Sequence, residues 1–492
     1  MNVYRPYELG EMNAFLASSM QNFLIMRGRR RIGKSWLLQE SIKPAQKLGY
    51  SVFSFTGRPQ ERTTKQRLAK EWAQFSGRVG PSRIKTSELD WMDILKDILL
   101  FNDDRKKRLL LIIDEIQWIS PPDGSFVGAL KESWILLERQ QLTKIIVCGS
   151  STKWFTQATE GDTAVLRGMA NAGELWVKPF SLRDVREHWG GANWSQEQTA
   201  LLYMILGGIP LYLNLISKNL PFVHAVNQAL FCGGGLFVKE QRELLSLEFN
   251  LQGENFSQLL LTELGRYSYT KGELERILGR ASARVSDLIE KLLQYKILRG
   301  IQRIDSKTAN KRDYRYTICD PYLLFYYSVM SPRIEQIVNN KNHGQLFTSV
   351  FSPINSLHIQ NFTGPAFENL VIQTLQNTYF LNPKPAIFDK LFLHTAPSVV
   401  EEVWVLDKTQ VAQFDIVVKC HSDSIVRFIE CKWSSENDPR WLAEIKNKPF
   451  ALNFSIGESR LNFLCLLTRP SPVFLKQAAD LGVAIITLES LF

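Results

Sequence analysis

The chain has 492 residues, of which 45% are hydrophobic and 22% are charged, and its formal net charge is +10. This length is too great for a single hydrophobic core, so about three domains are expected, with the composition of a folded soluble protein. The positive charge suits an anionic partner such as DNA. The six cysteines show no CxxC spacing, which argues against a zinc site and a disulfide framework.

The chain shows no sign of export or of membrane insertion. The first fifteen residues, MNVYRPYELGEMNAF, lack the apolar segment of a signal peptide. The most apolar stretch, residues 201–216, is shorter than a membrane span and contains Gly207, Gly208 and Pro210. We therefore expect a cytoplasmic protein with reduced cysteines and no membrane partner.

A phosphate-binding loop is the first motif along the chain. Residues 22–26 are expected to form a buried strand, which leads into GRRRIGKS at residues 28–35 and then into an amphipathic helix. This is a complete G-x-x-x-x-G-K-[ST] pattern in its strand–loop–helix setting, although a basic surface loop would have the same composition. Gly28 and Gly33 let backbone N–H groups turn inward around phosphate oxygens, and the helix N-terminus adds its dipole.

Lys34 is expected to contact the β- and γ-phosphates of ATP, and the Ser35 hydroxyl is expected to bind Mg²⁺. The full set of expected nucleotide-binding residues is Gly28, Arg29, Arg30, Arg31, Ile32, Gly33, Lys34, Ser35, Trp36, Asp114 and Pro210.

An acidic strand end follows later in the chain. Residues 109–113 form an apolar run, as expected for a parallel strand that is covered on both faces, and Asp114 and Glu115 come directly after it. Carboxylates at the carboxyl end of a central strand lie where ligands bind in open α/β sheets. Asp114 is expected to hold Mg²⁺ through water, and Glu115 to polarise the attacking water; the alternative is a solvated strand end.

Two further segments complete an α/β pattern. Residues 51–56 and 144–151 are expected to be strands, and the second ends in Ser150 and Ser151. Ser150 would contact the γ-phosphate or the attacking water, although hydroxyls are common at strand ends. The order of strands and helices predicts a parallel sheet with crossover helices.

These segments together resemble one family. GRRRIGKSWLL, LIIDEIQW, CGSS, LRG (166–168), VKPFSL (177–182) and GGIPLYL (207–213) are similar to the archaeal-type ATPases, relatives of AAA+ and STAND ATPases. The resemblance covers residues 1 to about 230. It implies that Gly208 and Pro210 begin lid helices near adenine. It also implies that Arg167 is either a trans-acting arginine finger, which would require a homo-oligomer, or a solvated arginine.

The middle of the chain predicts a winged helix. Phe256, Leu259, Leu260 and Leu264 share one helical face. In the next helix Thr270 and Glu273 would form a capping box and Gly279 would end it, and Ser282 would cap the third helix. A basic strand–turn–strand segment follows. DNA contact is one interpretation and a protein- or lid-docking surface is the other, and the residues expected at DNA are Arg280, Arg284, Lys307, Lys311 and Arg312.

The C-terminal part contains four charged residues on one expected helix and two expected strands. Glu368 lies on an expected helix at 364–376, Asp415 on a strand at 411–420, and Glu430 and Lys432 on one face of the strand in RFIECKWSS. This order resembles the PD-(D/E)XK nuclease core, which the family above often carries.

The resemblance implies that Asp415 and Glu430 bind one divalent cation and that Glu368 completes its environment. Lys432 would orient or deprotonate the attacking water, or stabilise charge on the phosphorus. The alternatives are an inert descendant of the fold or a local ion pair of Lys432. Gln413 stands where many relatives have an acidic residue, which weakens the case for a second metal.

We therefore expect a multidomain α/β protein with a P-loop ATPase core (1–180), a helical lid (181–250), a winged helix (251–335) and a PD-(D/E)XK nuclease-like domain (336–492). The expected function is an ATP- and Mg²⁺-dependent, AAA+-like ATPase coupled to a nuclease-like domain that acts on DNA. The alternative is a nucleotide-controlled switch whose C-terminal fold binds without cleaving. The candidate catalytic residues are Glu115, Ser150, Arg167, Glu430 and Lys432, and the candidate metal ligands are Ser35, Asp114, Glu368, Asp415 and Glu430.

Overall fold

A computed structural model describes residues 5–59, 63–77, 90–99, 108–122, 124–137, 143–150, 152–160, 166, 172–190, 194–248, 255–303, 314–339, 346–350, 356–376, 385–391, 397, 399–406, 411–420, 425–434, 436–447 and 459–492. The chain divides into two compact units, Met1–Pro179 and Phe180–Phe492, which we describe separately. Among these described residues, no helix is both long and apolar enough to cross a bilayer.

The first unit is built on a five-stranded sheet in which every neighbouring pair is parallel. The strand order is β2-β3-β4-β1-β5, so β4 lies between the strand before the P-loop and the acidic strand β3. All five carboxyl ends meet at one edge, which confirms the expected parallel α/β sheet. The strands are β1 (Phe23–Arg27), β2 (Tyr50–Thr56), β3 (Arg108–Asp114), β4 (Thr143–Gly149) and β5 (Ala172–Trp176).

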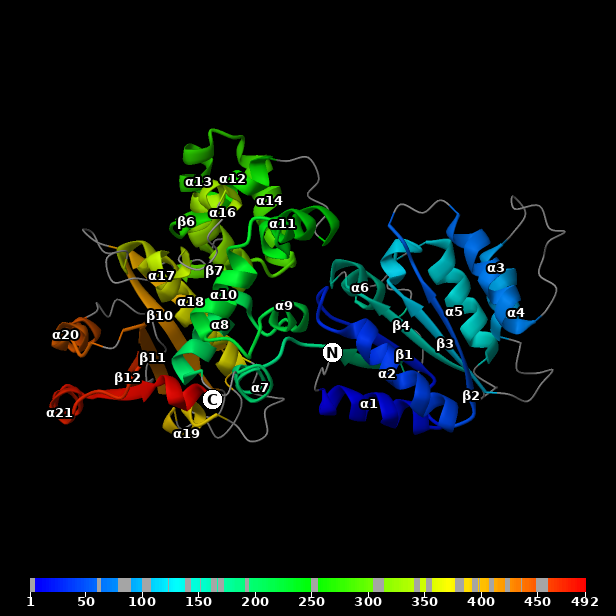
Figure 1. The fold of residues 1–492 in the computed structure, drawn as a ribbon, viewed down its shortest axis with the longest axis horizontal. Helices are drawn as coiled ribbons and strands as arrows, with labels where there is room; N and C mark the ends of the chain where they lie inside the picture. Colours follow the sequence, from blue (N-terminus) through cyan, green and yellow to red (C-terminus); the bar gives the residue numbers. More distant parts are fainter. Residues whose placement is uncertain are drawn as a thin grey trace. The chain divides into compact units, whose positions relative to one another are not determined.

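Helices cover both faces of this sheet (Figure 1), which explains the apolar strand sequences. Every residue of β3 after Arg108 is buried. One face packs against α3 (Thr64–Ser76), α4 (Trp91–Leu99), α5 (Ser125–Leu137) and α6 (Thr152–Thr159) in a single hydrophobic core. The other face is covered by α1 (Pro6–Ala17) and α2 (Lys34–Lys47).

The second unit opens with short helices: α7 (Leu182–His188), α8 (Gln196–Leu206), α9 (Pro210–Asn214), α10 (Phe222–Leu230), α11 (Leu236–Glu243) and a π-helical turn (Leu244–Glu248). Capping boxes at Ser181 and Ser195 begin α7 and α8. Gly207 ends α8 with φ of 63°, a conformation that favours glycine. Gly208 then lies against the backbone of Phe180, whose N–H donates to the Gly208 carbonyl over 2.8 Å.

We expect Gly208→Ala to lower the stability of this unit. An added Cβ would lie 2.0 Å from the Phe180 carbonyl oxygen, and backbone cannot move aside cheaply. The cost should be about 1–3 kcal/mol, the usual range for an overpacked site. Thermal unfolding measures it, with Gly234→Ala as the control because an added Cβ there meets nothing within 4 Å. Equal melting temperatures for the two variants would contradict this account.

The next elements follow the order expected for a winged helix: α12 (Asn255–Leu264), β6 (Tyr269–Thr270), α13 (Lys271–Leu278), α14 (Ser282–Gln294), β7 (Leu298–Arg303) and β8 (Arg315–Ile318). The capping box of Thr270 and Glu273 is present, and Gly279 ends α13 in the left-handed conformation.

Two local expectations in this region were wrong. Ala281, with no side-chain cap, is the N-cap of α14, so Ser282 already lies inside the helix. Leu259 is 52% exposed, because the buried face of α12 runs through Phe256, Leu260 and Leu264 at intervals of four residues.

The C-terminal part contributes α15 (Pro321–Phe325), a π-helical turn (Tyr326–Met330), a 3₁₀ turn (Ser331–Arg333), α16 (Ile334–Asn339), α17 (Leu346–Val350), α18 (Ser356–Gln376), α19 (Ile387–Lys390), β9 (Val399–Leu406), β10 (Val411–Lys419), β11 (Ile425–Lys432), α20 (Pro439–Asn447), β12 (Ser459–Leu466), α21 (Pro472–Asp480), β13 (Val483–Thr487) and a 3₁₀ turn (Leu488–Leu491). Helix α18 begins at Ser356 rather than at Gly364, so Glu368 lies well inside the helix and not near its start.

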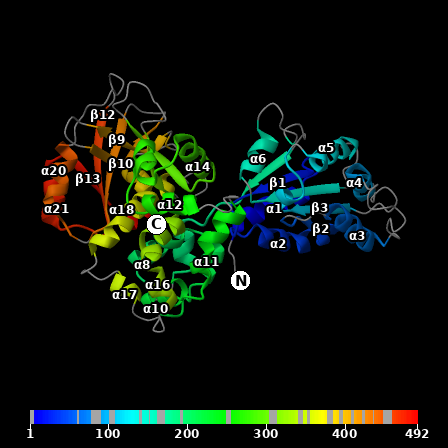
Figure 2. The same cartoon turned by 90° about the horizontal axis from the view of Figure 1, so that it is seen from above.

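One sheet of eight strands runs through the second unit, in the order β13-β12-β11-β10-β9-β7-β8-β6. Strands β11, β12 and β13 are parallel, and β10 is antiparallel to both of its neighbours. Strand β7 pairs in parallel with β9 through Gln302–Val403 and Arg303–Trp404. Helices α20 and α21 lie beside each other against β12 and β13 (Figures 1 and 2), with Leu442, Leu464 and Phe474 in their shared core.

Candidate functional site

The P-loop lies between β1 and α2 at the carboxyl edge of the first sheet. Arg31 and Gly33 both have positive φ, 69° and 95°, a backbone conformation typical of loops whose successive N–H groups form an anion-binding concavity. Gly28 has no room for a side chain, because a Cβ would lie 2.5 Å from the Val177 carbonyl oxygen at the end of β5. The loop is therefore held tightly at its first glycine and turned at Arg31 and Gly33.

Lys34 and Ser35 lie at the first turn of α2. Lys34 is buried, with 5% of its surface exposed. Its ammonium group donates to the carbonyl oxygens of Gly28 at 2.8 Å and Arg29 at 3.0 Å. The Ser35 hydroxyl donates to Asp114 Oδ2 over 3.3 Å, so it joins the P-loop to the end of β3. A hydroxyl and a carboxylate at this separation are oxygen donors of the kind that Mg²⁺ prefers. Ser35 and Asp114 therefore fit the expected cation.

The sequence analysis did not identify Arg5, whose side chain forms hydrogen bonds with the backbone of the P-loop and of the segment after β5. Arg5 is 3% exposed, and its Nη2 donates to the carbonyl oxygens of Ile32 at 2.9 Å and Lys178 at 2.8 Å. Its Nη1 also donates to the Glu8 carboxylate. A buried guanidinium that satisfies carbonyls from two separate segments holds the P-loop against the segment that follows β5. The one sequence feature that could have drawn attention to Arg5 is its spacing from Glu8 on either side of Pro6, the proline that begins α1.

The acidic strand end is organised by a third polar residue, Gln117. Asp114 is 7% exposed and its Oδ1 accepts from the Glu115 N–H over 2.9 Å. Glu115 has a φ of 53°, a strained conformation for this residue type. Its Oε2 accepts from the Ser150 hydroxyl over 3.3 Å and from Gln117 Nε2, which also donates to Ser150 at 3.2 Å. The structure therefore brings Glu115 and Ser150 together, while their expected roles at the attacking water and the γ-phosphate stay predictions.

Two glycines make room for this polar group. An added Cβ at Gly57 would lie 2.4 Å from the Glu115 carbonyl oxygen, and one at Gly149 would lie 2.3 Å from Gln117 Oε1. Gly57 also donates its N–H to the Asp114 carbonyl over 2.9 Å. The ends of β2, β3 and β4 are thus packed closely around Glu115.

Other expected nucleotide contacts stay predictions. Arg29, Arg30, Arg31, Ile32 and Trp36 lie in or directly after the loop, where Ile32 is buried and the others are partly exposed. Arg167 and Ser151 fall outside the described residues, so the arginine finger and the homo-oligomer that it implied stay untested. Gly208 and Pro210 belong to the second unit, and their expected place near adenine is likewise untested.

Comparison with known proteins supports the same assignment for this part of the chain. Residues 3–216 match a family described as "ATPase domain predominantly from Archaea". The matched residues include the P-loop, the acidic strand end and the GGIP segment. This match supports an archaeal-type ATPase domain with a parallel-sheet P-loop fold.

Individual relatives and solved structures share low sequence identity with this chain. An uncharacterized protein of Methanocaldococcus jannaschii is 23% identical over 340 residues, which cover 68% of this chain and 70% of the relative. The Walker-type ATPase PABY2304 of Pyrococcus abyssi has a TM-score of 0.45 at 17% identity, covering 66% of this chain and 96% of its own. The ORC2 protein of Aeropyrum pernix, in ADPNP–ADP complexes, has a TM-score of 0.42 at 12% identity, covering 69% and 94%.

Outside the ATPase domain, a second group of charges lies where α18 meets the eight-stranded sheet. Asp415 and Glu430 are 9% and 5% exposed on neighbouring strands β10 and β11. Asp415 Oδ2 accepts from the Cys431 N–H over 2.8 Å, which fixes this carboxylate beside β11. Glu368 approaches from α18, and its charge interacts with those of Asp415, Glu430 and Lys432. The four residues of the expected nuclease-like motif are therefore neighbours.

The electrostatics of this group differ from one member to the next. Burial, and then the Asp415 carboxylate, raise the pKa of Glu368 to about 8. Burial alone would lower the pKa of Lys432, but Asp415, Glu430, Glu444 and Glu368 outweigh it and raise that pKa above its usual value. Lys432 therefore stays charged at neutral pH. A charged ammonium cannot take a proton from water, so of its three expected roles the deprotonation of water is disfavoured.

These carboxylates do not form a ready-made three-ligand cage. Within the part of the chain that the structure describes, no set of three His, Cys, Asp or Glu side chains is placed to hold a metal ion. Mg²⁺ commonly binds through one or two carboxylates and keeps several waters, which two of these residues could provide. The expected ligand set of Glu368, Asp415 and Glu430 therefore stays a prediction.

The raised pKa of Glu368 leads to a testable pH dependence of stability. The folded protein keeps this proton up to about pH 8, whereas the unfolded chain loses it near 4.5. The stabilisation is complete below the unfolded pKa and is lost as the pH rises through the folded one. Glu368→Gln lacks this pH-dependent stabilisation. We therefore expect the melting temperature of the variant, relative to that of wild type, to rise by several degrees between pH 5 and pH 9.

Differential scanning calorimetry in EDTA buffers would measure this gain. Glu489→Gln, an exposed change in the last 3₁₀ turn, is the control. Parallel wild-type and Glu368→Gln curves would refute a raised pKa at Glu368.

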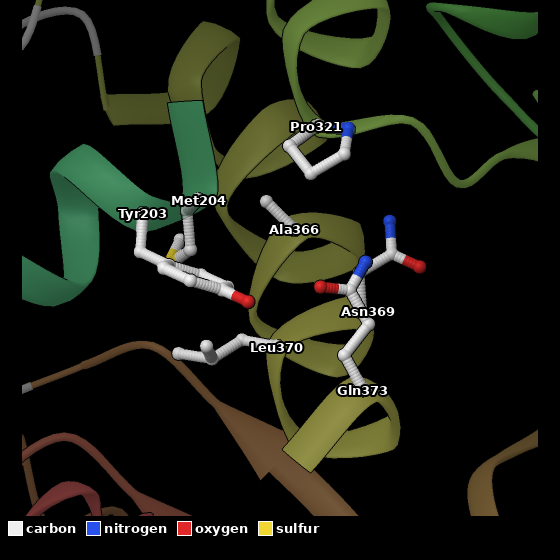
Figure 3. A pocket seen from close by; sticks show the side chains of 7 residues that line it. All are labelled: Tyr203, Met204, Pro321, Ala366, Asn369, Leu370 and Gln373. Atoms are coloured by element: carbon white, nitrogen blue, oxygen red, sulfur yellow. The ribbon is translucent and has the colours of Figure 1, made fainter. Parts of the chain in front are cut away.

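The second unit also contains a shallow pocket between α8 and α18, shown in Figure 3. It has no room for a water molecule, so we do not assign a ligand to it. Its wall on α18 includes Asn369, the neighbour of Glu368. The residues around it are Tyr203, Met204, Pro321, Ala366, Asn369, Leu370 and Gln373.

The expected DNA-contacting helix carries charges of both signs. On α14, Arg284 and Lys291 are exposed, but so are Asp287 and Glu290. The Arg284 guanidinium lies over the Phe256 ring, 5.2 Å from its centroid, rather than extending outward alone. Arg280 is exposed just before the helix, while Lys307, Lys311 and Arg312 fall outside the described residues. In the described part, this helix does not offer a basic stripe to phosphates.

Proposed function

We propose that the chain is a Mg²⁺-dependent ATPase of AAA+-like type. Its nucleotide would bind at the carboxyl edge of the first sheet, and residues 181–250 would act as a lid. The observation that carries this proposal is the Ser35–Asp114 contact of 3.3 Å, which joins a complete P-loop to the acidic strand end. The family match over residues 3–216 supports it.

In this proposal each residue at the edge has a separate task. Lys34 would leave the carbonyls of Gly28 and Arg29 for the phosphates, and the inward N–H groups of the loop would bind phosphate oxygens. Mg²⁺ held by Ser35 and Asp114 would neutralise phosphate charge. Glu115 would accept a proton from the attacking water, and Ser150 and Gln117 would hold its carboxylate in place.

Nucleotide binding and turnover by the full chain test this proposal directly. We expect wild type to bind a fluorescent ATP analogue with millimolar Mg²⁺ and to release phosphate. Lys34→Ala should lose binding, and Lys47→Ala, at the far end of α2, should keep it. A wild-type protein with intact circular dichroism and no affinity for ATP would overturn the proposal.

We further propose that the second unit couples this ATPase to a nuclease-like domain acting on DNA. Residues 251–335 would form the winged helix, and residues 336–492 the PD-(D/E)XK-like domain. The support is the juxtaposition of Glu368, Asp415, Glu430 and Lys432 where α18 meets β10 and β11. The net charge of +10 suits a nucleic-acid partner.

A second candidate is a nucleotide-controlled switch whose C-terminal fold binds a partner without cleaving it. The mixed charges on α14 favour this reading, and so does the lack of a three-ligand metal group among the described residues. A nuclease assay separates the two. Supercoiled, linear and single-stranded DNA would be incubated with Mg²⁺ or Mn²⁺, with and without ATP. Cleavage supports the nuclease proposal, and binding without cleavage supports the switch.

A further inference from the structure

The hairpin formed by β7 and β8 is not a free wing. On one side, strand β7 pairs with β8 from Leu298–Ile318 to Ile301–Arg315. On its other side β7 pairs with β9 of the C-terminal sheet at Gln302 and Arg303. A strand paired on both edges is part of one continuous sheet, so a residue on β7 can belong to the C-terminal charge cluster.

Arg299 of β7 makes this connection with its side chain. Its Nη1 donates to Oδ1 of Asn369, the residue after Glu368 on α18. Asn369 is 3% exposed, and its Nδ2 donates back to the Ile318 carbonyl of β8 over 3.4 Å. The hairpin and α18 are thus tied by hydrogen bonds in both directions, one residue from Glu368.

Arg299 is also electrically part of the cluster. Burial lowers the pKa of Arg299, and the nearby thiol of Cys319 and carboxylates of Glu368 and Asp415 oppose that effect. In return, the guanidinium lowers the pKa of Glu368. An arginine does not give up its proton in a protein, so it is a permanent cation. The cluster therefore contains three carboxyl groups, from α18, β10 and β11, with Lys432 and Arg299 as its cations. At neutral pH Glu368 keeps its proton, so Asp415 and Glu430 supply the negative charge.

We propose that Arg299 is the built-in counter-ion of the C-terminal cluster: it holds the carboxylates together without metal and opposes a divalent cation that binds them. The second half of this statement rests on the metal site proposed above. The first half does not, since it concerns only charges that the chain itself provides. The β7–β8 hairpin, which was expected to contact DNA as a wing, would then contribute Arg299 as a positioning residue to the C-terminal charge cluster.

The metal-free protein tests the first half. Arg299→Gln leaves buried carboxylates without a partner, so we expect its melting temperature in EDTA to fall by roughly 5–10 °C. Asp415→Asn removes a negative charge but keeps an oxygen for the Cys431 N–H, so in the Arg299→Gln background it should restore at least half of that loss. Simple addition of the two losses would overturn the counter-ion role.

Two further variants separate charge from other effects. Arg299→Lys keeps the cation, and we expect it to stay within a few degrees of wild type; a fall as large as that of Arg299→Gln would overturn the proposal. Arg315→Gln is the matched control on the same hairpin, because Arg315 donates to Ser268 and pairs with Glu273. Its loss of stability should not be restored by Asp415→Asn.

Mn²⁺ alone tests the second half. We expect Arg299→Gln to bind Mn²⁺ about tenfold more tightly than wild type, because one repelling charge is gone. The rise in melting temperature with Mn²⁺ should be larger in that variant, and unchanged in Arg315→Gln. Equal or weaker Mn²⁺ binding by Arg299→Gln would overturn the competition. If Mn²⁺ affects no variant, the metal site itself is wrong, and the metal-free comparison still decides the role of Arg299.

Discussion

Replacing Glu115 by Gln is expected to lower ATP turnover by roughly 10²–10⁴-fold, the usual contribution of a positioned general base. Glutamine keeps the shape of the side chain and one oxygen for the Ser150 and Gln117 donors. It cannot take a proton from water. In the proposed function the phosphate contacts come from the P-loop and not from Glu115, so we expect Mg²⁺-ATP to stay bound and to accumulate on the variant.

Steady-state phosphate release and filter binding of labelled ATP would measure the two effects separately. Glu132→Gln on α5 is a matched control, since that side chain is exposed in the same unit. Turnover of Glu115→Gln within twofold of wild type would show that Glu115 is not the base. Loss of ATP binding in the same variant would show that its carboxylate instead shapes the nucleotide site.

Gln117 is the side chain that links Glu115 to Ser150. It donates to both Glu115 and Ser150, and it follows Glu115 by two residues on a 3₁₀ turn (Ile116–Trp118). In the proposed function Gln117 positions Glu115 and does not itself react. A change at Gln117 should therefore lower the rate of hydrolysis while leaving the affinity for ATP unchanged.

The P-loop and the acidic strand end could be predicted because their chemistry is local. A short segment such as GRRRIGKS contains the turn residues, the ammonium and the hydroxyl that the site uses, in one strand–loop–helix unit. The same holds for the capping box of Thr270 and Glu273, where the two partners are three residues apart. Such features do not depend on distant pairing.

The features that were missed depend on contacts between distant parts of the chain. Arg5 donates to the carbonyls of Ile32 and Lys178, and the sequence around Arg5 does not indicate either of these distant partners. The pairing of β7 with β9 joins residues about a hundred positions apart, so two expected domains share one sheet. Arg299 then enters a charge cluster whose other members are on α18, β10 and β11. Periodicity predicts which residues form a strand, but it does not predict the strand's neighbours.

The C-terminal motif lies between these two cases. The order of Glu368, Asp415, Glu430 and Lys432 was readable, and the structure brings the four residues together. Their ionisation was not readable, because it depends on burial and on the sum of the surrounding charges. The pKa shifts in turn decide which of the expected roles of Lys432 is chemically reasonable.

If the second unit cleaves DNA as proposed, we expect Lys432→Gln to reduce metal-dependent cleavage strongly. Since the surrounding carboxylates raise the pKa of Lys432, its ammonium would stabilise the charge that develops on the phosphorus. Losing one such group usually costs about 10²–10³-fold in rate. Glu430→Gln should be at least as damaging, because it removes a metal ligand as well.

The assay would follow nicking of supercoiled DNA over time with Mn²⁺ or Mg²⁺, and Lys446→Gln, exposed on α20, is the control. The pH profile separates two roles of Lys432. A charge-stabilising ammonium gives a wild-type rate that does not depend on loss of its proton between about pH 6 and 9, whereas a general base would make the rate climb with pH through its own titration. If Lys432→Gln keeps full cleavage while Glu430→Gln abolishes it, the metal site stands and Lys432 is only a partner of the buried carboxylates.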